Sequence, residues 1–527
     1  MNNNSESGVE LKLSIASIHD DSVDLEAVDR LHAAFGEKKV SKLFWHQATP
    51  NMCATIFYQI SVAGAVAALS RSGTDYAASY SFAAPFHIVH VAAGMFISGG
   101  TSNTLSKLFG SKELKQARKA ATQSIYLAIV LSCAMIGCIY PFIDKILKFL
   151  GTPQILMGPS RLYAQIMICG GIITNITMWS NAVLRAQGLA HYVLISAVIR
   201  GSFTLILGCC FILIKGWVMS GFCAAILSGD FAALVVNLSF IYFSKKSVVK
   251  PKLSGLSKIF LQVIKNGTAE LAAGLSNLIM VSLINLGIIS LESDSGVSGN
   301  ELISLSIIMI ASRVNTASIT QTLSQIMIIM SLNTTLPMAN YNREARNWDR
   351  LRRINVYSLI ATLLTMGILS LILIAFSPLI PRIYFTNKES RSIMEHTLQL
   401  NCAGWAFASI TTNSMEIIQS FGLNAFASRW SFIVRTGVSI GVYVYVFKKC
   451  ANMWDFIKAF PINIAISSGL SLIFLFLVRN FFVLTKKGVN SMEADEDRRL
   501  GQIKKLDHVT LKMLVLGPIF LLLNRNR

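Results

Sequence analysis

The sequence predicts an all-α polytopic membrane protein, with twelve transmembrane helices in two six-helix pseudo-symmetric halves around a central cavity. First, 53% of its 527 residues are hydrophobic and 14% are charged, whereas a soluble globular protein has roughly a quarter of its residues charged. Second, apolar stretches of about 20 residues, long enough to cross a hydrocarbon core of roughly 30 Å, recur along the chain. Third, several polar connections recur at a constant spacing, which indicates an internal repeat.

The apolar stretches define twelve candidate spans. Each is expected to be a helix, because a helix satisfies all its backbone hydrogen bonds within one segment. The spans cover 46–70, 77–104, 121–142, 162–184, 192–214, 217–243, 267–290, 302–332, 355–380, 395–418, 430–447 and 458–482. The polar stretch 1–44 precedes them with no visible signal peptide, so the first span is expected to direct insertion. A short amphipathic helix is expected around Val23–Phe35.

Lysine and arginine residues gather in connections that would share one side of the membrane. These are the connections after the second, sixth and eighth spans, whereas the connection after the fifth span carries Lys215 alone. Because cytoplasmic loops are rich in lysine and arginine, the basic connections and both termini are predicted to be cytoplasmic. This distribution accounts for the formal charge of +20 without a nucleic-acid partner. It predicts a multi-pass protein of the plasma membrane or the cell inner membrane.

The same pattern divides the chain into two lobes. We expect a cytoplasmic tail at 1–44, lobes at 45–243 and 267–482, a basic cytoplasmic linker at 244–266 and a cytoplasmic tail at 483–527. The apolar end of that tail, 511–523, is short and broken by Gly517 and Pro518. It is therefore expected to lie at the membrane interface rather than to form a thirteenth helix.

A shift of 234 positions superimposes three connections of the first half on three of the second. Gly110–Lys119 falls on Glu344–Arg353, Leu150–Gln154 on Tyr384–Lys388, and Arg185–Gly188 on Gln419–Gly422. An even number of spans in each repeat makes the halves parallel, related by an axis along the membrane normal. Such halves typically enclose a cavity that is exposed to the two sides of the membrane in turn.

Four segments resemble the multidrug and toxin extrusion (MATE) family, in its DinF-like bacterial-type branch. They are Gly99–Arg118, Leu336–Asn347, Leu184–Gly188 and Ile418–Gly422, and the resemblance covers roughly 45–482. It implies a fold of two six-helix lobes and a structural or gating role for the residues that match the family's motifs. These are Gly99, Gly100, Ser106, Gly110, Arg185, Gly188, Pro337, Tyr341, Asn342 and Gly422.

The chain departs from this family pattern where a cation would be expected to bind. Ala65 lies near the position of the usual carboxylate in the first span, and Ile206 and Leu207 lie near that of an Asp-Pro pair in the fifth. Glu344 replaces a glycine of the second-half loop. The cation site of the first lobe therefore cannot be transferred to this chain.

Five titratable residues inside or near the spans are candidates for ion coupling, because a charge at membrane depth costs several kcal/mol and needs a reason. The resemblance places Glu270 at a cavity-facing position of the family, although an interfacial ion pair with Lys265 is an alternative. A pair of histidines three residues apart could relay protons, or could be hydrogen-bonded inside the bundle. The full set is Glu270, Asp230, Glu416, His87 and His90.

Polar residues inside other spans are candidates for the substrate cavity. Asn175, Asn181 and Asn285 either line it or hold helices together. The nine cysteines lie mostly in apolar runs without ligand spacing, and no metal site is expected.

These features favour a secondary antiporter that exchanges amphipathic, often cationic, organic molecules for H⁺ or Na⁺ by alternating access. The expected partners are small organic substrates and membrane lipid, with no cofactor other than the coupling ion, and a monomer is expected. A lipid-linked oligosaccharide flippase of the same superfamily and a transport-inactive membrane protein are the alternatives. An enzyme is disfavoured by the lack of a catalytic constellation, and ATP-driven transport by the lack of a Gly-x-x-x-x-Gly-Lys-Ser/Thr loop.

Overall fold

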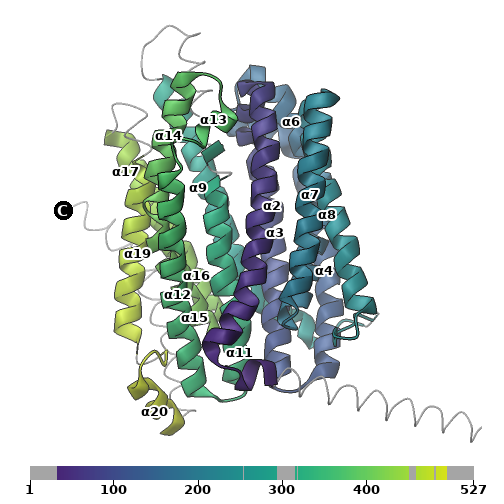
Figure 1. Cartoon of the computed structure of the whole chain (residues 1–527), viewed down its shortest axis with the longest axis vertical. Coiled ribbons are helices and arrows are strands. Elements are labelled where there is room, and N and C mark those ends of the chain that lie inside the picture. The colour runs from purple at the N-terminus through teal and green to yellow at the C-terminus, as the bar shows by residue number, and fades with distance from the viewer. Residues whose placement is uncertain are drawn as a thin grey trace, which may run out of the picture.

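A computed structural model describes residues 33–252, 255–293, 315–316, 319–449, 458–479 and 482–494. The expected amphipathic helix around Val23–Phe35 therefore lies almost wholly outside the described residues, as does the apolar run 511–523. Long helices standing side by side make up the molecule (Figure 1). Nine helices of the described part are long and apolar enough to cross a membrane.

The first half follows the predicted spans closely. Its long helices are α2 (Val40–Ser72), α3 (Thr74–Gly110), α4 (Leu114–Ile139), α6 (Met157–Ala186), α7 (Ala190–Cys209) and α8 (Val218–Phe243). Short elements complete it: η1 (Ala33–Glu37), η2 (Tyr140–Phe142), α5 (Ile143–Phe149), η3 (Gln154–Leu156) and η4 (Cys210–Ile214). Helix α2 begins inside the stretch assigned to the polar tail, because Leu43 and Phe44 are buried in the core.

The second half is more irregular. It contains α9 (Lys258–Ser293), a helical stretch at 319–328, η5 (Ile329–Thr335), α11 (Leu336–Glu344), α12 (Trp348–Ala375), α13 (Pro381–Tyr384), α14 (Lys388–Cys402), α15 (Trp405–Ser420), α16 (Asn424–Ser431), η6 (Phe432–Gly437), α17 (Val438–Lys449), α19 (Ala459–Val478) and α20 (Lys486–Ala494). Helix α9 starts within the expected linker, since Ile259 and Val263, four residues apart, are both buried.

Three predicted spans are not among the nine long helices. The span 302–332 is described only in part. The span 395–418 is divided at Gly404 between α14 and α15, and the span 430–447 is interrupted by the π-helical turn η6. Breaks at membrane depth are tolerated where the freed backbone groups are buried in protein or line a cavity.

The offset of 234 residues also relates the backbone of the two halves. Helices α4 and α12 begin at 114 and 348, α6 and α15 end at 186 and 420, and α7 and α16 begin at 190 and 424. Two left-handed turns recur with them. Lys112 (φ 62°) corresponds to Arg346 (φ 55°), and Gly188 (φ 74°) to Gly422 (φ 78°). The sequence repeat is therefore a repeat of helix boundaries and turns.

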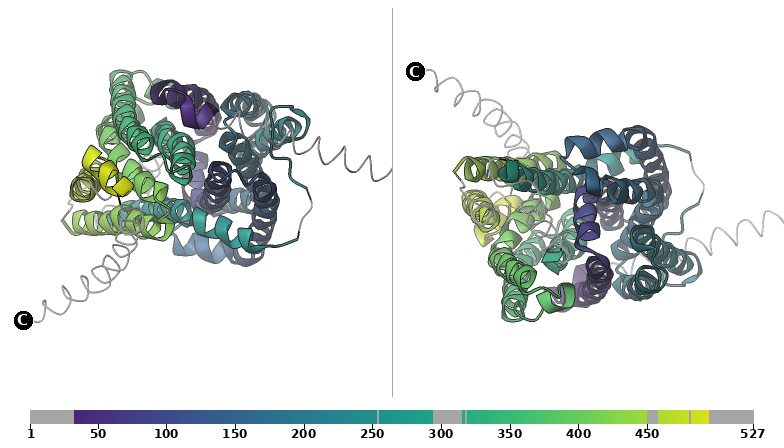
Figure 2. Two further views of the ribbon diagram at one scale, coloured as in Figure 1. Left: turned by 90° about the horizontal axis from the view of Figure 1, so that it is seen from below. Right: turned by 90° about the horizontal axis from the view of Figure 1, so that it is seen from above.

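Helices α3 and α9 form the main packing contact between the halves, which gather on opposite sides of the molecule (Figure 2). Two glycines of α3 allow this approach. A Cβ atom at Gly100 would overlap the carbonyl oxygen of Val263, and one at Gly99 would lie 2.5 Å from the carboxyl carbon of Glu270. The paired glycines of the motif thus bring the carboxylate of α9 against the first half.

Candidate functional site: the cavity between the halves

A cavity of about 440 Å³ lies between the two halves. Its walls come from α2, α3, α6, α7 and α8 of the first half, and from α9, the stretch 320–333, α14, α15, α17 and α19 of the second. Most of the wall is apolar, with aromatic side chains such as Tyr58, Tyr80, Trp405 and Phe460. The acidic and basic side chains of the wall are His87, Arg185, Arg200 and Glu270.

Glu270 lies where this cavity meets the contact between α3 and α9. Its side chain is 4% exposed, and its Oε1 accepts a hydrogen bond of 3.2 Å from Nδ2 of Asn103. The other oxygen, Oε2, makes no hydrogen bond with the described residues. The carboxylate forms no ion pair with Lys265, the alternative partner in sequence. Glu270 is thus a buried carboxyl group on the cavity wall with half of its hydrogen-bonding capacity unused.

Four asparagines from both halves are linked by hydrogen bonds beside this carboxylate, and we call them the asparagine cluster: Asn103, Asn266, Asn340 and Asn424. Asn103 donates to the carbonyl oxygen of Asn266 (3.1 Å), and Asn340 donates to Oδ1 of Asn103 (3.4 Å). Asn424 donates to Oδ1 of Asn266 (2.7 Å), which also accepts from Nζ of Lys107 (2.7 Å). These bonds cross from α3 to α9 and α11, so they close one end of the cavity.

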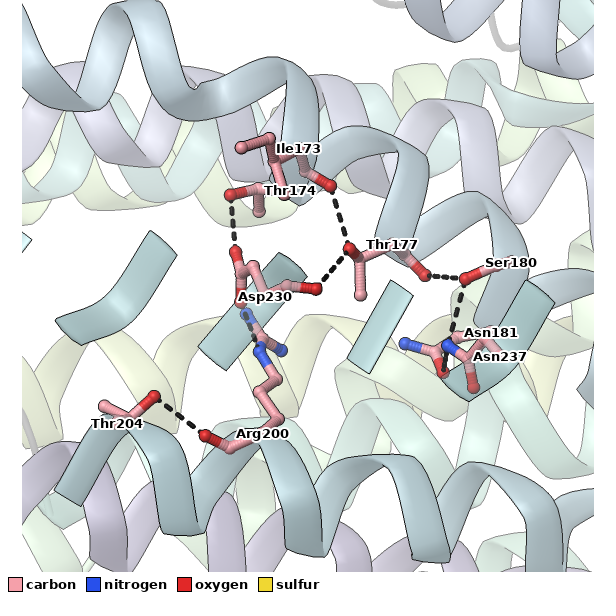
Figure 3. Close-up of polar contacts among 9 residues, drawn as sticks. All are labelled: Ile173, Thr174, Thr177, Ser180, Asn181, Arg200, Thr204, Asp230 and Asn237. Carbon is pink, nitrogen blue, oxygen red and sulfur yellow. Dashed lines mark hydrogen bonds and ion pairs between the residues drawn. The ribbon is translucent and has the colours of Figure 1, made fainter. Parts of the chain in front are cut away.

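Asp230 is already paired. Its carboxylate forms an ion pair with Arg200 and accepts a hydrogen bond of 2.6 Å from Thr174 (Figure 3). The carbonyl oxygen of Asp230 accepts from Thr177, and the guanidinium of Arg200 stacks 3.8 Å from the ring centroid of Tyr58. Because its charge is compensated within the first half, Asp230 is less suited than Glu270 to exchange a cation.

The remaining coupling candidates lie in different surroundings. His87 faces the cavity, whereas His90 is fully buried with its ring against Gly171 of α6. Glu416 is also fully buried on α15, and neither carboxylate oxygen has a hydrogen-bond partner among the described residues. Of the five candidates, Glu270 and His87 line the cavity.

The three asparagine candidates for substrate contact also lie in different places. Asn181 lines the cavity and accepts a hydrogen bond from Asn237 (3.0 Å). Asn175 is fully buried and donates to Ser132 (2.8 Å), so it connects α6 to α4. The side chain of Asn285 lies outside the described part of the chain.

Most of the motif residues act in turns and close contacts. Ser106 donates to the carbonyl oxygen of Ser102 (2.7 Å), and a Cβ atom at Gly110 would lie 2.9 Å from the carbonyl oxygen of Tyr341. Tyr341 stacks on Phe35, and Asn342 donates to the carbonyl oxygen of the same phenylalanine (3.2 Å). Pro337 is the second residue of α11 and directly follows the π-helical turn η5. Arg185 instead lines the cavity, with a buried Nε that has no partner among the described residues.

Sequence reasoning missed Asn103 and Arg435. Asn103 belongs to the motif segment Gly99–Arg118, but an asparagine near a helix end gives no signal of its own. Arg435 lies within the eleventh predicted span, and a cation at that depth was a usable signal. No group of three or more His, Cys, Asp or Glu residues suited to a metal ion lies in the described part of the chain.

A helical membrane bundle with two related halves around a cavity defines a class of membrane transporters. Residues 50–229 match the MatE family model. A MOP superfamily transporter from Pyrococcus furiosus, described as having a binding pocket of reverse polarity, has a similar structure, with a TM-score of 0.74 and 15% identity over 86% of this chain and 99% of the other. An outward-facing multidrug resistance MATE family transporter has a TM-score of 0.71 and 16% identity, over 85% of this chain and 96% of the other. A MATE structure in a straight conformation has a TM-score of 0.72 and 14% identity, over 86% of this chain and 99% of the other.

The predicted resemblance to the MATE family is confirmed by the family model over residues 50–229, and the predicted fold class is confirmed by the similar structures. No curated protein matches its sequence significantly. The related proteins are transporters rather than enzymes. The assignment to the DinF-like branch stays a prediction.

Proposed function

We propose that the protein is a secondary antiporter that moves amphipathic organic molecules, cationic ones among them, in exchange for H⁺ or Na⁺. The observation that carries the proposal is the position of Glu270. It is a buried carboxyl group on the wall of the central cavity, with Oε1 bonded to Asn103 and Oε2 unused. A buried carboxylate is costly unless it is paired, so a proton or a sodium ion is its natural partner.

The contact to Asn103 links that ion to movement of the halves. Glu270 lies on α9 of the second half and Asn103 on α3 of the first. An ion bound to the carboxylate neutralises the charge that strengthens the hydrogen bond from the amide of Asn103. Binding and release of the ion thereby change the strength of the contact that closes one end of the cavity, as coupled exchange requires.

The proposal is tested with Glu270→Gln, which is nearly isosteric, in proteoliposomes with an imposed H⁺ or Na⁺ gradient. Loss of gradient-driven uptake with retained substrate binding is expected, since the amide takes up no proton and has no charge to attract Na⁺. Asp230 is unsuitable as a control, because its substitution would leave Arg200 without its ion-pair partner. The control is Asp144→Asn, at an exposed pair with Arg161. Wild-type uptake by the Gln variant across pH 6 to 8, or uptake that requires ATP, would exclude this mechanism.

One observation favours the flippase alternative. Arg185 and Arg200 both line the cavity, and Arg185 has no carboxylate partner among the described residues. The reverse polarity described for the pocket of the Pyrococcus furiosus transporter is a parallel in a similar fold. A fluorescent lipid pyrophosphate in vesicles provides the test. Protein-dependent flipping that Arg185→Gln abolishes would support the flippase, and absence of flipping would leave the antiporter.

A further inference from the structure

A second cavity of about 170 Å³ lies in the second half, next to the central cavity. The two cavities share parts of their walls, including Ile88, Gln325, Trp405 and Phe460, so they adjoin one another. Arg435 of η6 is the charged residue in the wall of the second cavity. Small polar side chains line the same wall: Ser276, Thr411, Thr412, Ser439, Asn463, Ser467 and Ser468.

The repeat shows that Arg435 is the counterpart of Arg200. Up to the start of α7 and α16 the offset is 234 residues, and the π-helical turn η6 then adds one. At an offset of 235, Arg200 and Thr204 correspond to Arg435 and Ser439. The hydroxyl groups agree with this correspondence, because Thr204 donates to the carbonyl oxygen of Arg200 and Ser439 to that of Arg435.

The counter-ion of Arg200 has no equivalent beside Arg435. Helix α19 takes the place of α8 in the second half and carries no Asp or Glu, and the residue 234 positions after Thr174 is Ala408. Ala408 and residues of α19, Asn463 and Ile464 among them, line the second cavity. The cavity thus lies beside Arg435 against α15 and α19, the counterparts of the helices α6 and α8 that supply Thr174 and Asp230 around Arg200 (Figure 3).

Arg435 has one hydrogen bond within the described structure, from its Nη2 to the hydroxyl of Thr412 (2.7 Å). A guanidinium has five N–H donors, and no carboxylate of the described residues forms an ion pair with it. A charge at membrane depth without a partner is costly, and such charges are typically paired or belong to substrate and ion pathways. The guanidinium and the empty space beside it are therefore matched to an anion supplied from outside the chain.

We propose that the second cavity binds a carboxylate through Arg435. The planar fork of the guanidinium suits the two oxygens of a carboxylate. The apolar wall toward the central cavity, with Trp405 and Phe460, suits an attached aromatic or aliphatic body. The site thus selects amphipathic organic carboxylates, including zwitterions whose cationic group reaches Glu270. Binding at this site does not depend on ion coupling at Glu270.

Calorimetric titration of the full-length protein in nanodiscs tests this site, with sodium salicylate, its neutral analogue salicylamide, and sodium acetate as probes. Salicylate is expected to bind at least tenfold more tightly than salicylamide. Tighter binding of salicylate than of acetate identifies an organic carboxylate as the ligand, whereas equal binding of both identifies a small free anion at the same guanidinium. Absence of salicylate binding, or equal binding of salicylamide, would overturn the proposal.

Variants assign the binding to Arg435. Arg435→Gln is expected to weaken salicylate binding at least tenfold, and Arg435→Lys to retain it within a few-fold, since the charge remains. Asn463→Asp places a carboxylate of α19 in the cavity wall that also contains Arg435, and is expected to abolish binding while the fold is kept. The control Arg382→Gln removes an exposed arginine of α13. Unchanged affinity in folded Arg435→Gln or Asn463→Asp would contradict the site.

The same titration separates this inference from the proposed function. Glu270→Gln is expected to bind salicylate with wild-type affinity, because it lines the central cavity and is absent from the wall around Arg435. Loss of coupled transport in Glu270→Gln together with retained salicylate binding supports both proposals. If Glu270→Gln retains both coupled transport and salicylate binding, the proposed role of Glu270 is contradicted, whereas the carboxylate site at Arg435 is supported.

Discussion

At the scale of single residues, the position of Glu270 depends on the absence of a side chain at Gly99 of α3. Gly99 leaves room for the carboxyl group, and a Cβ atom there would lie 2.5 Å from its Cδ. The same arrangement brings Asn103, one turn further along α3, within hydrogen-bonding distance of Oε1. The carboxylate of Glu270 thus packs against one face of α3, in the space left by Gly99 and within reach of the amide of Asn103.

We therefore expect Gly99→Ala to displace Glu270. Overpacking of this kind typically costs about 1–3 kcal/mol, so both thermal stability and gradient-driven transport should fall. The matched control is Gly137→Ala on α4, where a Cβ atom has open space. That change should be neutral or slightly stabilising, because alanine favours a helix over glycine by roughly 0.5–1 kcal/mol. Equal behaviour of the two variants in thermal unfolding and uptake would contradict the packing argument.

At the scale of elements, the left-handed turns determine where α7 and α16 leave their preceding helices. Gly188 and Gly422 both follow a long helix and adopt φ values of 74° and 78°. A side chain in this region costs roughly 1–2 kcal/mol. Glycine is therefore favoured at both positions by the left-handed backbone conformation, and not only by the space that neighbouring side chains leave.

Alanine at either glycine is expected to lower stability by about 1–2 kcal/mol. The effect should be larger for Gly422→Ala, because its Cβ atom would also overlap the guanidinium of Arg343, whereas around Gly188 the nearest atom is 3.6 Å away. Thermal unfolding in detergent measures both. A stabilising effect of either substitution would rule out the left-handed conformation at that turn.

The sequence predicted the limits of the helices better than it predicted which side chains contact each other. Spans such as 217–243 follow from hydropathy alone, and α8 (Val218–Phe243) coincides with that span. The division at Gly404 and the π turn η6 could not be predicted, since both depend on buried neighbours of the broken helices. Glu270 was placed through resemblance, while its bond to Asn103 joins residues 167 positions apart and has no local signal.

At the scale of the whole molecule, the repeat predicts a common side for two turns. Ser111 and Ala345 are exposed, lie 234 residues apart and adjoin the left-handed residues Lys112 and Arg346. Halves related by an axis along the membrane normal place both on the same face, and the basic connections predict that this face is cytoplasmic.

Ser111→Cys and Ala345→Cys, each in a background without native cysteines, should therefore resist an impermeant maleimide in intact cells. Both should react after the membrane is permeabilised. Labelling of both in intact cells would reverse the orientation, and labelling of one alone would contradict the parallel arrangement of the halves.

Contacts between the halves exist at both ends of the central cavity. The asparagine cluster closes the end near the start of α2, whereas at the other end Ser70 donates a hydrogen bond of 2.9 Å to Oδ1 of Asn315. Alternating access requires these two contacts to open in turn. A covalent link at Ser70 and Asn315 should therefore hold that end closed without touching Glu270.

We expect oxidation of the Ser70→Cys/Asn315→Cys double variant, in a background without native cysteines, to abolish transport, and dithiothreitol to restore it. Each single variant should transport equally with and without oxidant, which controls for damage by the reagent. Substrate binding should persist in the linked protein if the cavity remains open at the other end. Transport at the unlinked rate after complete cross-linking would mean that this end does not open during the cycle, and alternating access between these two halves would then be excluded.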